Sequence, residues 1–174
     1  MKHPELLSLH SVSDLRISPG TSRCALLVHT PCEAENNYET HLYVSDFTVS
    51  YPIGMSGITS FAWVDDAALA VGRPSADSTQ FALLSLKDGS EGTVWNIPFD
   101  ARIEGWVLGQ LLISARRPIT EEKAQEDGSW TILDELPIWE DGEGYRAKIR
   151  RQLFLCSYGG QPIRISPEEM DVRI

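Results

Sequence analysis

The sequence has 174 residues, of which 42% are hydrophobic and 23% are charged, and its formal net charge at pH 7 is -10. This size and composition are typical of a soluble globular chain that is long enough for a domain with a buried core. The acidic balance argues against nucleic acid as a partner, because a duplex binder needs a basic face that displaces counterions from phosphates.

The N-terminal segment predicts neither a targeting signal nor a membrane anchor. Pro4 and Glu5 interrupt its first apolar residues, and no run in the chain reaches the roughly 18 apolar residues of a membrane span. The cysteines, Cys24, Cys32 and Cys156, are odd in number and widely spaced, unlike those of a disulfide framework. We therefore expect a cytoplasmic protein with no membrane partner.

Short apolar runs separated by glycine, proline and aspartate recur along the chain and predict an all-β fold. Three of these runs, CALLVHTP, AALAVGRP and LLISARRP, are apolar strands that end in a proline. The prolines, Pro31, Pro74 and Pro118, are 43 and 44 residues apart. A proline has no N–H for a strand ladder, so each of them marks the point where the chain leaves the sheet.

Each of these runs is the second of four predicted strands in a repeating unit. The first strands are SDLRI, TSFAW and IEGWV, the third strands are THLYVSDF, QFALLSLKDG and RQLFLCSYGG, and weaker fourth strands such as TVWNIP follow. A period of about 40 to 45 residues with four strands per unit is the signature of a β-propeller blade. A single four-stranded sheet leaves both faces bare, and radial stacking of further copies buries them.

The repeat predicts a partial β-propeller of about three four-stranded antiparallel blades plus the first strand of a fourth. The predicted blades are 12–56, 58–101 and 103–167, with a long insertion at 119–150 in the third blade, and 168–174 begin the fourth. The alternative is a β-sandwich of ordinary hairpins, in which the regular spacing of the prolines would be a coincidence.

Two stretches resemble the propeller of the prolyl oligopeptidase family of serine peptidases, in its acylaminoacyl-peptidase and dipeptidyl-peptidase branch. The first runs from Ser11 to Phe47 and is similar to the family's ISPDG, EEN.Y and LYVVD elements. It matches at Ser18, Pro19, Gly20, Glu33, Glu35, Asn36, Asn37, Tyr38, Leu42, Tyr43, Val44 and Asp46, without the aspartate of ISPDG. In the second blade, Val64, Asp65 and Asp66 stand where the family often carries another SPDG.

The second stretch, ELPIWEDGEGYRAKIRRQLFL, resembles a more specific family element, ELPFW.NGEGF…RR..LY. The matching residues are Glu135, Leu136, Pro137, Trp139, Gly142, Glu143, Gly144, Tyr145, Arg150 and Leu153. The resemblance implies a two-part protein, in which this propeller precedes a C-terminal α/β-hydrolase domain, caps its active site and limits access to peptides. The implied partners are that hydrolase domain and a peptide substrate.

The chain itself carries no recognisable catalytic machinery. A hydrolase nucleophile needs the G-x-S-x-G elbow, and the nearest string, GMSGI at 54–58, lacks the final glycine. The acidic stretch around Gly128 fails as an EF-hand, because Lys123 falls at the first ligand position. Metal-binding C-x-x-C and H-E-x-x-H pairs are also absent. We therefore expect no cofactor, no metal and no catalysis by these residues alone.

The long insertion is the candidate functional segment. The resemblance suggests that it reaches the substrate cavity, where Glu135 and Glu143 would meet the amine of a peptide. Tyr145 or Arg146 would hold a carbonyl there, and Trp139 belongs to the same substrate-facing set. In this reading the apolar residues of the segment would form an extra hairpin. Two alternatives remain: a solvated excursion with weak charge pairs, or docking on the hydrolase domain or on another subunit.

A second functional reading is a free-standing protein-interaction scaffold of the TolB or WD-repeat type, which would present its loops to a partner. Under either reading, each terminal blade would leave one sheet face bare. Bare apolar faces promote association, so we expect self-association through these exposed faces.

Overall fold

The computed structural model describes residues 9–32, 34, 36–54, 56–92, 94–119, 138–140, 144–146 and 149–173, of which 138–140 and 144–146 are described as main chain only. These residues contain strands and no helix, which confirms the all-β prediction. Accordingly, no helix in the described part of the chain is long and apolar enough to cross a membrane.

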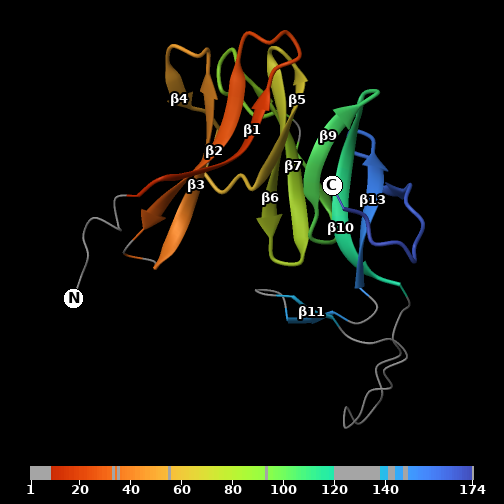
Figure 1. Cartoon of the computed structure of the whole chain (residues 1–174). Helices are drawn as coiled ribbons and strands as arrows, with labels where there is room; N and C mark the ends of the chain where they lie inside the picture. Colours follow the sequence, from red (N-terminus) through yellow and green to blue (C-terminus); the bar gives the residue numbers. More distant parts are fainter. Residues whose placement is uncertain are drawn as a thin grey trace, which may run out of the picture.

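Three four-stranded antiparallel sheets follow one another along the chain, as predicted (Figure 1). The first contains β1 (Ser11–Ile17), β2 (Cys24–Cys32), β3 (Asn37–Ser45) and β4 (Ser50–Pro52). The second contains β5 (Ser60–Asp65), β6 (Ala68–Ser75), β7 (Ser78–Ser85) and β8 (Trp95–Ile97). The third contains β9 (Arg102–Val107), β10 (Gln110–Pro118), β13 (Ile149–Cys156) and β14 (Ile163–Arg164).

The sheets stack face to face around two separate cores. The core between the first and second sheets includes Ala25, Leu27, Leu42, Val44, Phe61, Trp63, Leu69, Val71, Ala82 and Leu84. The core between the second and third sheets includes Ala62, Ala70, Phe81, Ile97, Ile103, Leu111, Ile113, Phe154 and Cys156. The middle sheet therefore contributes alternate residues to both cores, and the sandwich alternative, with one core between two sheets, is wrong.

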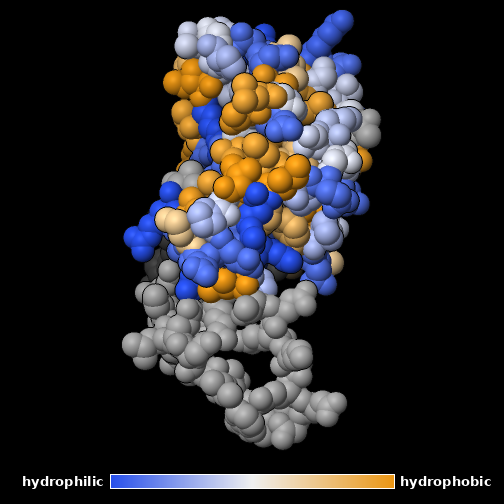
Figure 2. All heavy atoms as spheres, turned by 90° about the vertical axis from the view of Figure 1, so that its right-hand side faces the viewer, coloured by the Kyte–Doolittle hydropathy of each residue, from blue (hydrophilic) through white to orange (hydrophobic). Residues whose placement is uncertain are grey.

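The two outer sheets each keep a bare face. In the first sheet, Val12 and Ile17 are 59% and 55% exposed. In the third sheet, Val107 and Ile163 are 43% and 67% exposed. Figure 2, which views the molecule from the side of the third sheet, shows hydrophobic side chains gathered in the upper and central part of this face, with hydrophilic ones below.

The second strand of each sheet ends at or one residue after the proline that predicted its end. Pro31 and Pro74 each lie one residue before the end of β2 and β6, and Pro118 is the last residue of β10. Residues 168–173 lie outside the strands, and the Val172 N–H donates to the Arg151 carbonyl along the edge of β13. The first strand of a fourth blade thus stays a prediction, since a strand needs neighbours from its own sheet to pair with.

Candidate functional site: a charged pocket at the inner edge of the sheets

The first strands of the three sheets, β1, β5 and β9, converge, because β5 contacts both of the others. Beside them lies a pocket of about 740 Å³, a size that suits a small ligand. Its charged lining residues are four arginines (Arg16, Arg102, Arg116 and Arg151) and three acids (Asp14, Asp100 and Glu104). The pocket is therefore a polar site within an otherwise apolar stack of sheets.

Backbone irregularities aim two carboxylates at this pocket. The pairing of β1 with β2 shifts register between Ser13 and Arg16, and Asp14 within this bulge has a φ of 51°. The pairing of β9 with β10 shifts in the same way around Glu104. Bulges turn side chains away from the regular alternation of a strand. A left-handed φ at a residue other than glycine is uncommon and is tolerated best by Asn and Asp, which fits Asp14.

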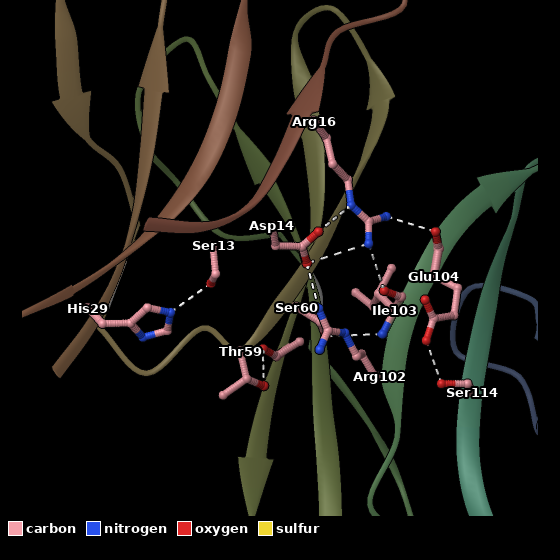
Figure 3. Close-up of polar contacts among 11 residues, drawn as sticks. Ser13, Asp14, Arg16, His29, Thr59, Ser60, Arg102, Ile103, Glu104 and Ser114 are labelled. Carbon is pink, nitrogen blue, oxygen red and sulfur yellow. Dashed lines mark hydrogen bonds and ion pairs between the residues drawn. The ribbon is translucent and has the colours of Figure 1, made fainter. Parts of the chain in front are cut away.

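Arg16 connects the first sheet to the third at the pocket wall (Figure 3). Its Nε donates to Asp14 Oδ1 at 2.9 Å. Its Nη1 donates to the main-chain carbonyl of Glu104 at 2.8 Å, and its Nη2 to that of Ile103 at 3.4 Å. The guanidinium also lies 5.5 Å from the centre of the Phe61 ring, within the range of a cation–π contact. Arg16 is therefore held by groups from all three sheets.

Two of the three carboxylates of the pocket, those of Asp14 and Glu104, have hydrogen-bond partners. Asp14 Oδ2 accepts a bond of 3.1 Å from Arg102 Nη2, and the Asp14 side chain is only 11% exposed. Glu104 Oε1 accepts a bond of 2.5 Å from the Ser114 hydroxyl. Both acids are thus anchored inside the site (Figure 3). Charge-assisted hydrogen bonds of this kind are short and hold a side chain in one orientation.

Further bonds between sheets make the inner edge rigid. The Ser60 hydroxyl in β5 accepts the main-chain N–H of Ile103 in β9 at 3.1 Å, in a buried position. The indole Nε1 of Trp63 in β5 donates to the main-chain carbonyl of Arg16 at 3.0 Å. Polar bonds as well as apolar packing therefore position the pocket-lining strands.

A serine–histidine pair elsewhere in the first sheet resembles a nucleophile and its base. Ser13 Oγ lies 2.7 Å from His29 Nε2 (Figure 3), and His29 Nδ1 lies 3.0 Å from the Thr40 hydroxyl. A catalytic serine needs its histidine oriented by a carboxylate or amide and needs oxyanion donors near the nucleophile. Thr40 is a hydroxyl on the neighbouring strand β3. We interpret the set as a cross-strand polar contact.

The predicted site residues lie partly outside the described residues. Glu135 and Glu143 are not described. Trp139, Tyr145 and Arg146 are described as main chain only, in a hairpin of β11 (Ile138–Glu140) and β12 (Gly144–Arg146). Trp139 pairs with Tyr145 in this hairpin. The hairpin agrees with the extra hairpin expected in the insertion, whereas a role in substrate binding stays a prediction.

The insertion and the pocket share one end of the third sheet. β10 ends at Pro118 and β13 begins at Ile149, while Arg116 and Arg151, two strand positions further in, pair with each other and line the pocket. The pocket residues of the inner strands are not among the site residues predicted from the sequence. The available signal was a pair of charged residues inside each of the strand-like runs SDLRI and ARIEGW, where apolar residues are expected.

Several solved structures of peptidases have a similar fold. An acylaminoacyl peptidase in complex with Z-Gly-Gly-Phe-chloromethyl ketone gives a TM-score of 0.69 at 17% identity and covers 89% of this chain and 24% of that chain. The uncomplexed acylaminoacyl peptidase of Pyrococcus horikoshii gives 0.68 at 16% identity, with 90% and 25% covered. The β-propeller domain of the Trilobed protease from Pyrococcus furiosus gives 0.53 at 12% identity, with 89% and 43% covered.

No protein-family model and no curated protein matches the sequence. The likenesses establish the β-propeller fold, which confirms the predicted fold class. The chain spans about a quarter of the length of the acylaminoacyl peptidases that it matches. The family that the sequence resembles is also the family of these structural neighbours.

Proposed function

We propose that this chain is the non-catalytic N-terminal propeller segment of a serine peptidase of the prolyl oligopeptidase family. In this proposal it caps the active site of an α/β-hydrolase domain and restricts access to peptide substrates. The observation that carries the proposal is the superposition of 89% of the chain on 24% of an acylaminoacyl peptidase. Two stretches that resemble the family independently, around Ser18 and around Trp139, support it.

The chemistry of the chain is consistent with a division of labour between two domains. The sequence has no G-x-S-x-G elbow. The described residues form stacked sheets that hydrogen bonds join at their inner edge. A cap that keeps its shape needs such a rigid structure. The size of the opening to the active site would limit which peptides enter. This restriction needs no reactive group in the propeller.

The insertion extends this proposal. The insertion joins the ends of β10 and β13 that lie beside the pocket, and we propose that Glu135 and Glu143 meet the amine of a substrate at this end. We expect the charge-reversed variant E135K/E143K to lower kcat/KM of the natural protein for peptides with a free amine. Peptides with an acetylated N-terminus serve as the control, because they carry no charge for the two glutamates to meet. An equal kcat/KM for variant and wild type would rule out this role.

The proposed function is tested on the natural protein isolated from its own cells. We expect a fluorophosphonate probe to label a polypeptide that contains these residues, and mass spectrometry to find the labelled serine within G-x-S-x-G. We also expect hydrolysis of short acyl-peptide anilides and little hydrolysis of intact casein, since a cap excludes large substrates. Absence of labelling in a protein that binds a folded partner would instead support the scaffold reading.

A further inference from the structure

The pocket at the inner edge has unused cationic donors. Asp14 is occupied by Arg16 and Arg102, and Glu104 is occupied by Ser114. Arg102 uses one of its five N–H donors in this way, and its side chain is 58% exposed.

Arg151 is the second available donor. Its main-chain N–H donates to Asp171 Oδ1 and its main-chain carbonyl accepts from Val172. No hydrogen bond or ion pair joins its guanidinium to another residue in the part of the chain that the structure describes. The side chain nevertheless lines the pocket and is half-buried. A half-buried guanidinium without a partner is a ready site for an anionic group.

The strand register places both arginines on one face of the third sheet. Arg102 pairs with Ser114, and Arg151 pairs with Arg116, two residues further along β10. From ordinary strand spacings, the Cα atoms of Arg102 and Arg151 are roughly 12 Å apart. Two extended arginine side chains cover such a gap from opposite sides, so both guanidinium groups can reach one small anion between them.

The rest of the lining selects among anions. Asp100, an exposed acid, lines the same pocket, and a fixed negative charge disfavours a dianion such as phosphate. The planar fork of arginine matches a carboxylate through two parallel hydrogen bonds. A ligand with one carboxylate and nearby N–H donors, as at the C-terminus of a peptide, complements both arginines and Asp100.

We propose that Arg102 and Arg151 form a subsite that binds the C-terminal carboxylate of a short peptide in the pocket at the inner edge of the sheets. The proposal rests on the proposed function in taking a peptide as the ligand. It adds that the propeller, besides restricting access by size, recognises the end of the peptide that enters it.

Calorimetric titration of the protein with acetyl-trialanine and with the corresponding C-terminal amide tests the proposal. We expect the free acid to bind at least about tenfold more tightly than the amide, since the amide cannot accept two charge-assisted hydrogen bonds. R102Q and R151Q should each weaken binding of the acid and leave the amide unchanged. The control R164Q removes an exposed arginine that pairs with Glu168 and does not line the pocket, and it should bind as wild type does.

Equal affinity for acid and amide, no binding of either, or a preference that survives in the R102Q/R151Q double variant would overturn the proposal. A peptide that binds no more tightly than acetate would overturn the peptide as ligand, and a tighter complex with inorganic phosphate would overturn the choice of a carboxylate. These binding outcomes are independent of hydrolysis. Loss of probe labelling with retained acid preference therefore counts against the peptidase proposal alone, and the reverse result counts against the subsite alone.

Discussion

Arg16 donates a hydrogen bond of 2.8 Å to the main-chain carbonyl of Glu104, a residue 88 positions further along the chain. Arg16 belongs to β1 and Glu104 to β9, so this bond joins the first sheet directly to the third. Phe61 of the middle sheet lies against the same guanidinium. One side chain therefore contacts all three sheets at their inner edge.

Replacing Arg16 with methionine should loosen this edge. The variant keeps much of the apolar stem but leaves the carbonyls of Ile103 and Glu104 without a donor, and it leaves Asp14 with Arg102 alone. We expect the free energy of unfolding in urea to fall by about 1–3 kcal/mol. The matched control R164M removes an exposed arginine and should change it by less than about 1 kcal/mol. Equal losses in both variants would contradict the role assigned to Arg16.

Another largely buried ion pair lies inside the middle sheet. Arg73 Nη1 donates to Glu91 Oε2 at 2.9 Å, and the two side chains are only 10% and 14% exposed. Removing Glu91 as alanine leaves a buried cation unpaired, so we expect a loss of about 3–5 kcal/mol in the free energy of unfolding. The double variant R73M/E91L should recover most of it, because no charge is then left buried. If the double variant is as unstable as E91A, the loss of stability comes from lost packing and not from an unpaired buried charge.

The regular part of the fold could be predicted because burial leaves a repeating trace in the sequence. The runs around Leu69 and Phe81 are apolar on consecutive positions, since the middle sheet is covered on both faces. The three prolines recur at the ends of equivalent strands. Both signals are local in the sequence, so they can be recognised without knowing which strands pair.

The pocket could not be predicted in this way, because it depends on pairing register. Asp14 and Glu104 enter the site only through bulges, each created by a mismatch of one strand with its neighbour. The contact of Arg16 with the third sheet likewise requires the stacking of sheets that are distant in sequence. The sequence shows the charged residues inside SDLRI and ARIEGW, but it does not show which residues they contact in the fold.

The bare outer faces predict association of the 174-residue chain. Ile163 on the third sheet and Val12 on the first are 67% and 59% exposed, on sheets whose other faces are buried. We expect sedimentation at high micromolar concentration to detect oligomers, and Ile163→Lys and Val12→Lys each to shift the population toward monomer. The control is Val49→Lys, because Val49 is similarly exposed but lies in the turn before β4. A wild-type monomer at these concentrations would refute the prediction.

A pH-dependent turn follows β3. Asp46 accepts hydrogen bonds from the main-chain N–H groups of Val49 at 2.8 Å and Thr48 at 2.9 Å, which lower the pKa of its carboxyl. The folded chain thus holds the ionised form more firmly than the unfolded chain does. The resulting stability is present above the ordinary pKa of about 3.9 and is lost as the pH falls through the lowered value.

We therefore expect D46A to unfold at lower urea concentration than wild type at pH 7, with the difference shrinking as the pH falls below about 4. Asp88 occupies the matching turn of the second sheet and accepts from Ser90, with its pKa lowered in the same direction. D88A should show the same pH dependence. A difference between D46A and wild type that is constant across this pH range would contradict a role for the ionised form.

The three cysteines should differ in reactivity by their burial. Cys156 is fully buried in the core between the second and third sheets, and burial raises the pKa of its thiol, an effect that the nearby Trp95 indole partly offsets. Because the thiolate is the reactive form, Cys156 should resist alkylation. Cys32, which is half-buried at the end of β2, should react first.

Mass spectrometry of the native protein during a time course with iodoacetamide checks this order, and C32S should abolish the fast phase. Since the folded state holds the Cys156 proton more tightly than the unfolded chain does, its contribution to stability is present below the unfolded pKa of about 8.5 and fades as the pH rises through the raised value. We therefore expect the slow phase to track global unfolding and to accelerate above that pH. Alkylation of Cys156 as fast as that of Cys32 in the folded protein would mean that the second core is open.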